Sequence, residues 1–199
     1  MDKESERAFV EAFTQALVSL PFDMKVLVEA VVDPDLTEAV REVAAAALIH
    51  SFTPKDRHVE PYLRHTEDVV FLRLALQRVR GEGSEASKGF EAHWAESFTN
   101  LDEELRAYRE VFGEDIVDWL DARWPLLRKG VLEKKHPLQY VRDEALGQTL
   151  YDHASDFATE YPVTERSLGG RVRALCHFVE HLQRKHEQDK LMIHSVPQS

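Results

Sequence analysis

The stretch that decides the fold is Arg41–Val79, which reads REVAAAALIH SFTPKDRHVE PYLRHTEDVV FLRLALQRV. Its first part contains four consecutive alanines, Ala44–Ala47. It predicts a helix that other helices can approach closely, because its side chains are small on several faces. Pro54 and Pro61 then predict a loop over residues 53–65. Apolar residues return at helical spacing after this loop, so the stretch predicts two helices joined by a polar connection.

Apolar residues recur every three or four positions along most of the chain, which is typical of amphipathic helices. Proline and glycine mark the expected ends of helices. Pro21 is expected to end the first helix, and Gly113 is expected to end a long helix rich in aromatic residues. The expected helices cover residues 3–20, 22–32, 37–51, 66–79, 87–112, 116–127, 137–157 and 172–182. We therefore predict an all-α protein, a multi-helix bundle of about eight helices with no sheet.

The clearest break in composition is Gly81–Ser84, which lies between two helical regions. It predicts a boundary between an N-terminal helical region, residues 1–80, and a C-terminal helical bundle, residues 87–190. The two regions can also pack as a single domain, and the spacing of apolar residues does not decide between these arrangements. Residues 191–199 are expected to form a loose tail.

The charge balance restricts the class of partner. Lysine and arginine number 25 against 36 aspartates and glutamates, a net charge of −11, which disfavours nucleic acid and anionic membrane surfaces. No run approaches the roughly 18 apolar residues that a membrane-spanning helix needs, so we expect no membrane insertion. The charged start, Asp2–Arg7, does not resemble a signal peptide, and the single cysteine, Cys176, excludes an internal disulfide. These features predict a cytoplasmic protein.

No complete catalytic or cofactor motif occurs in the chain, so we expect neither catalytic residues nor a cofactor. The most suggestive string is His177-x-x-Glu180-His181, whose order matches the zinc-binding inverzincin pattern. Two histidines four positions apart share one helix face and can ligate zinc, while the glutamate can polarise a bound water. His153 adds a ligand type on another helix, but its place on an apolar stripe is more typical of a core histidine.

The helix–loop–helix stretch resembles a known family in its short motifs. Pro54-Lys55-Asp56 follows the alanine run, Pro61-Tyr62-Leu63 lies in the loop, and the acidic pair Glu67-Asp68 opens the second helix. In these features residues 41–79 are similar to the YkvA-like domain of unknown function, a short bacterial helical hairpin. The resemblance implies a fold element and no particular reaction. The family's loop is typically apolar, whereas this loop is polar, which argues against membrane association.

A polar loop between two helices suits a surface contact, and Val59, Tyr62 and Leu63 are the apolar side chains within it. We therefore predict a non-enzymatic protein-binding or adaptor module whose protein partner contacts these three residues. The alternative is a metal-dependent enzyme that uses the histidine and glutamate ligands named above, or a helical bundle that binds a small molecule. Amphipathic helices can also hide a dimer interface, so a homodimer stays open.

Overall fold

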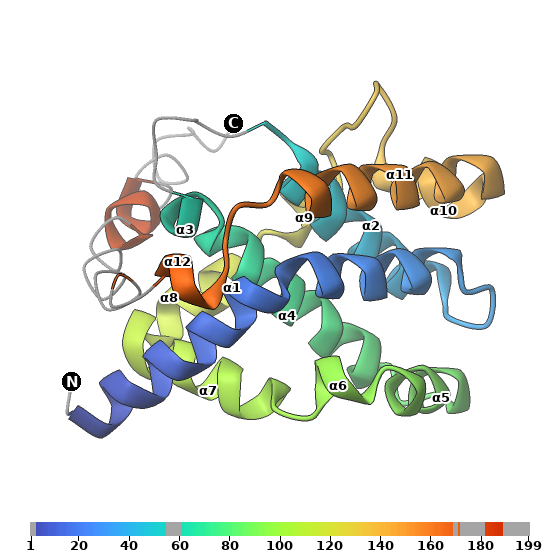
Figure 1. Ribbon diagram of the computed structural model, residues 1–199. Helices are drawn as coiled ribbons and strands as arrows, with labels where there is room; N and C mark the ends of the chain where they lie inside the picture. The colour runs from blue at the N-terminus through green and yellow to red at the C-terminus, as the bar shows by residue number, and fades with distance from the viewer. Residues whose placement is uncertain (1–2, 55–60, 169–170, 172–181, 189–199) are drawn as a thin grey trace, which may run out of the picture.

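Helix α1 (Lys3–Val32) is the longest element of the computed structural model and crosses the whole molecule, with α7 and α11 on opposite sides of it (Figure 1). The structure describes residues 3–54, 61–168, 171 and 182–188. Within these ranges the regular structure is helical, apart from an isolated bridge between Leu132 and Lys135, so the predicted all-α bundle without a sheet is confirmed. The elements after α1 are α2 (Glu38–Phe52), α3 (Pro61–Arg64), α4 (Thr66–Gly81), α5 (Glu85–His93), α6 (Ala95–Phe98), α7 (Leu101–Phe112), α8 (Glu114–Asp121), α9 (Trp124–Leu127), α10 (Pro137–Arg142), α11 (Glu144–Glu160) and α12 (Glu165–Leu168).

Helix α1 continues through Pro21, where the sequence predicted its end, so the prediction of two helices over residues 3–32 is wrong. A proline inside a helix has no N–H, which leaves the carbonyl four residues earlier without its usual donor. Here that carbonyl belongs to Leu17, and the Tyr161 hydroxyl donates a hydrogen bond to it at 2.7 Å. A side chain from the distant end of α11 therefore satisfies the group that the proline leaves free, and the helix persists.

Helix α2 carries the alanine run and packs against α1, α4 and α10. All four alanines, Ala44–Ala47, are fully buried. The small side chains let three helices approach α2, as the sequence predicted, because a larger residue on any of these faces needs space that the neighbouring helix occupies.

We expect Ala45→Leu to lower the free energy of unfolding by about 1–3 kcal/mol, because the added methylenes have no free volume to enter. Ala39→Leu is the matched control, since Ala39 is exposed on the same helix. Urea denaturation of both variants measures the difference, and equal stabilities would show that α2 is not closely packed at Ala45.

Three of the helices that the sequence predicted are interrupted in the structure. The expected helix over residues 116–127 is divided into α8 and α9 by a turn at Ala122 and Arg123. The expected helix over residues 87–112 is divided into α5, α6 and α7, because Trp94 and Asn100 leave helical geometry. The expected helix over residues 137–157 is divided at Asp143, which is extended and whose carboxylate accepts hydrogen bonds from two backbone N–H groups at the start of α11. Gly113, with a φ of 96°, ends α7 as predicted.

Buried side chains from α1 to Leu182 form one hydrophobic cluster. Its centre between α1 and α7 is aromatic: the rings of Phe9, Phe13, Tyr108 and Phe112 lie 5.1–6.2 Å apart, mostly edge to face. Helices that precede the glycine-rich segment at residues 81–84 pack against helices that follow it. Helix α1 contacts α7 and α11, and α2 contacts α10.

Residues 182–188 are helical, whereas most of the last predicted helix, residues 172–181, and the predicted tail lie outside the described residues. Among the described helices, none is both long and apolar enough to cross a membrane.

Candidate functional site

The loop residues that the sequence predicted as a partner contact are only partly described. Val59 and the side chain of Tyr62 lie outside the described residues. Leu63, on α3, is half-buried and packs against the hydrophobic core. The contact formed by these three residues therefore stays a prediction.

Of the residues that the sequence singled out as metal ligands, only His153 lies in the part of the chain that the structure describes. His177, Glu180 and His181 fall outside it. The His153 ring on α11 packs on the Phe52 ring with 5.6 Å between centroids, and its Nε2 lies 3.5 Å from Glu133 Oε1. No group of three or more histidine, cysteine, aspartate or glutamate side chains in the described ranges is arranged to hold a metal ion.

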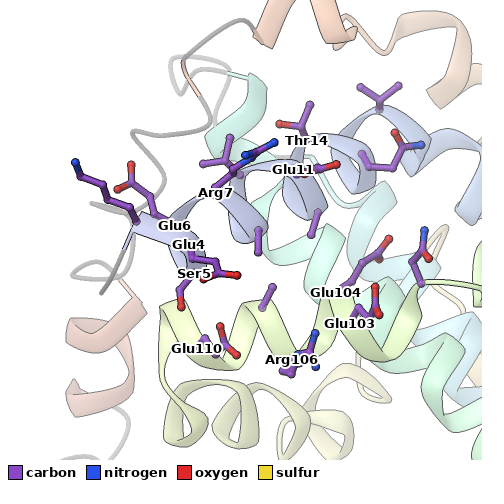
Figure 2. A pocket seen from close by; sticks show the side chains of 18 of the residues that line it. Glu4, Ser5, Glu6, Arg7, Glu11, Thr14, Glu103, Glu104, Arg106 and Glu110 are labelled. Atoms are coloured by element: carbon purple, nitrogen blue, oxygen red, sulfur yellow. The ribbon is translucent and has the colours of Figure 1, made fainter.

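A groove lies between α1 and α7, and we call it the α1–α7 groove (Figure 2). It is open to solvent along its length and has a volume of about 1280 Å³. On α1 it extends from Lys3 to Val18, a rise of roughly 22 Å, or four helical turns. Small-molecule sites are usually more enclosed and occupy about 300–1,000 Å³, so this shape suits an extended chain or a helix better.

Small and charged side chains line the groove, and most of the charged ones are exposed. Ala8 and Ala12 on α1 and Ala107 on α7 are among the small ones; Ala8 is exposed, Ala12 is half-buried and Ala107 is buried. The charged residues that line the groove are mostly acidic, with seven glutamates against one lysine and two arginines. The glutamates are Glu4, Glu6, Glu11, Glu103, Glu104, Glu110 and Glu165.

A buried network of charged and hydroxyl groups meets the groove at Glu104, and Arg73 on α4 is its centre. Arg73 is 4% exposed. Its Nη1 lies 2.6 Å from Asp23 Oδ2 on α1, its Nε donates to Glu104 Oε2 on α7, and its Nη2 donates to the Ser19 hydroxyl at 3.1 Å. Such a network is stable only while each charge keeps its partner, because an unpaired charge is expensive to bury.

Asp23 is bound more completely than Glu104 in this network. The hydroxyl of Ser19, one turn earlier on α1, donates to Asp23 Oδ2 at 2.7 Å, and the Ser97 hydroxyl on α6 donates to Oδ1 at 2.9 Å. Glu104 accepts from Arg73 through one oxygen only, among the hydrogen bonds of the described residues. Ser97 on α6 and Glu104 on α7 therefore both take part in the network, although the chain leaves helical geometry between these two helices.

Burial and neighbouring charges shift the pKa values of the residues in this network. Burial raises the pKa of Glu104, and the nearby charge of Asp23 adds to this effect, while Arg73 opposes it without cancelling it. Burial alone lowers the pKa of Arg73, but the two carboxylates outweigh it and raise that pKa well above its ordinary value. Burial also raises the pKa of the Tyr108 hydroxyl, which lies beside this network.

A second buried cluster surrounds Asp68, one of the acidic pair that resembles the YkvA-like motif. Asp68 is fully buried in the first turn of α4. His65 Nδ1 lies 2.8 Å from its Oδ2, and His50 Nε2 on α2 lies 3.6 Å from its Oδ1. The rings of Phe157 and Tyr161 pack edge-on against His65. The cluster therefore ties α2 and α4 to the end of α11.

Comparisons with family models, with curated proteins and with solved structures found no match to this chain. The resemblance of residues 41–79 to the YkvA-like family therefore stays a prediction.

The sequence analysis did not identify the α1–α7 groove or the network that meets it. Arg73 did carry a signal, because it is the one charged residue in the apolar run Val69–Leu76. Asp23 carried a weaker one, since it lies between Phe22 and Met24 on the apolar side of its helix. A charged residue at a position expected to be buried is informative, because it needs a partner there.

Proposed function

We propose that the protein is a non-enzymatic protein-binding module that docks a basic helical segment of another protein in the α1–α7 groove. The observation that carries the proposal is the groove itself: open, about four helical turns long, lined in part by alanines and acidic in balance. A helix can approach alanine side chains closely, and its cationic side chains can meet the exposed glutamates that line the groove.

The proposal fits the charge of the whole chain. A net charge of −11 attracts a basic partner over distance and repels nucleic acid, so both the encounter and the docked state favour a cationic protein segment. A cytoplasmic location is part of the proposal and is supported by the single cysteine, since proteins of reducing compartments do not depend on disulfides.

Charge reversal at exposed glutamates of the groove tests the proposal. The probe is a fluorescent amphipathic helix of about 18 residues made of lysine, leucine and alanine, which matches the length of the groove. We expect Glu11→Lys, Glu103→Lys and Glu110→Lys together to weaken its binding about tenfold or more, because three attractive contacts become repulsive. Fluorescence anisotropy at two salt concentrations measures the affinity and its electrostatic part.

The matched control reverses the same number of charges on another face. Asp152, Asp156 and Glu160 are exposed on α11, and none of them lines the α1–α7 groove. If the control variant loses as much affinity as the groove variant, binding follows the total charge of the protein and the groove is not the docking site. A peptide of the same pattern with glutamate in place of lysine should bind neither protein.

A further inference from the structure

The network that meets the groove at Glu104 holds more negative charge than positive. Asp23 and Glu104 supply two carboxylates, and Arg73 supplies one guanidinium. All three residues are nearly buried: Asp23 is 1% exposed, Glu104 8% and Arg73 4%. With both carboxylates ionised, the cluster carries one uncompensated negative charge in an environment where such a charge is costly.

Two observations place this surplus charge at Glu104. The two Asp23 oxygens together accept from Ser19 and Ser97, and Oδ2 also lies against Arg73. Glu104 has only the Arg73 Nε bond among the described residues. It is also the member of the trio that lines the groove, and Figure 2 shows its side chain pointing from α7 toward α1.

We propose that Glu104 is the anchor of the groove and binds one cationic side chain, a lysine ammonium or an arginine guanidinium, of the docked segment. This inference rests on the proposed function. The incoming cation balances the second carboxylate of the network and reaches it from the groove, which Glu104 lines. Glu104 then determines specificity, because it requires a positive charge at one position of the partner, whereas the exposed glutamates of the groove tolerate variation.

The groups around Glu104 also set how binding depends on pH. Arg73 from α4, Asp23 from α1 and Tyr108 from α7 face it. The cation binds only ionised Glu104, so affinity is full above the raised pKa of this carboxyl and falls as the pH drops through it. Stability responds in the opposite direction. A raised pKa means that protonated Glu104 favours the folded state, and this contribution is lost as the pH rises through that pKa.

Glu104→Gln separates an anchor from a merely structural group. Glutamine keeps the shape and still accepts from Arg73, but it carries no charge. We expect Glu104→Gln to be at least as stable as the parent protein at pH 7, and to bind the basic peptide about tenfold or more weakly. Its binding should also lose most of the pH dependence that protonation of Glu104 gives the parent protein. Glu103→Gln is the matched control, because Glu103 is the exposed neighbour that also lines the groove and should keep the pH dependence.

A series of peptides makes the test independent of any change in folding. Each lysine of the probe is replaced in turn by methionine, which keeps the length and removes the charge. At one position, the replacement should weaken binding to the parent protein about tenfold and leave binding to the Glu104→Gln variant unchanged. Such coupling is the signature of a direct pair in a double-mutant cycle. If no position shows this coupling while the charge reversals in the groove still weaken binding, Glu104 is not the anchor and the groove proposal stands. If the charge reversals have no effect either, both proposals fail.

Discussion

Replacing Arg73 by alanine is expected to lower the free energy of unfolding by about 3–5 kcal/mol, the cost of leaving buried charges without their partner. Arg73→Ala removes the only cation that contacts Asp23 and Glu104 among the described residues. It also removes the donor to Ser19. Chemical denaturation at pH 7 measures the loss. The loss should shrink in acid, where the stranded carboxylates can take up protons and become neutral.

Arg78→Ala is the control for this prediction. Arg78 is on the same helix and pairs with Asp121, but its side chain is 44% exposed and water solvates the partner that remains. Such exposed pairs contribute about 0–1 kcal/mol, so the two variants should differ by several kcal/mol. Equal losses would mean that the Arg73 network is as solvated as a surface ion pair, which would also remove the basis for a surplus charge at Glu104.

The local parts of the fold could be predicted from the sequence, because short-range patterns determine them. The alanine run predicted α2 and its close neighbours, and the apolar run after Thr66 predicted α4. Pro137 was expected to open a helix at its first turn, and it lies at the start of α10. In each case the residues that decide the element lie within or directly beside it.

Features that depend on distant partners could not be predicted in this way. The continuation of α1 through Pro21 depends on the Tyr161 hydroxyl, which is 144 residues from the carbonyl it satisfies. The aromatic spacing over residues 87–112 predicted one helix because the apolar side chains of α5, α6 and α7 all join the same core. Periodicity reports which face is buried, and a helix that bends around the core keeps that face inward.

The candidate site also depends on residues that are distant from one another in the sequence. The spacing of apolar residues predicted an amphipathic helix over residues 3–20, but the groove depends on which helix packs beside α1 and how closely it approaches. Arg73 could be recognised as anomalous in an apolar run, yet its partner Glu104 is 31 residues away and its other partner is on α1. The pairing of buried charges becomes visible only when the helices are placed.

The second large effect is expected at Phe13, which forms the centre of the contact between α1 and α7. Phe13→Ala should lower the free energy of unfolding by about 3–5 kcal/mol, because it removes a fully buried ring and leaves a cavity. The ring lies 5.1 Å from Phe9, 5.2 Å from Tyr108 and 5.9 Å from Phe112, centroid to centroid. These aromatic contacts add to the loss beyond the buried area.

Phe22→Ala makes the same chemical change on the same helix at a side chain that is 37% exposed, and it should cost clearly less. The comparison also tests the groove, because the Phe13 cluster holds together the two helices that form its walls. Phe13→Ala should therefore weaken binding of the basic peptide under conditions where the variant remains folded, and Phe22→Ala should not. If the two variants unfold at the same denaturant concentration, the aromatic cluster does not hold α1 against α7, and the groove cannot owe its shape to that contact.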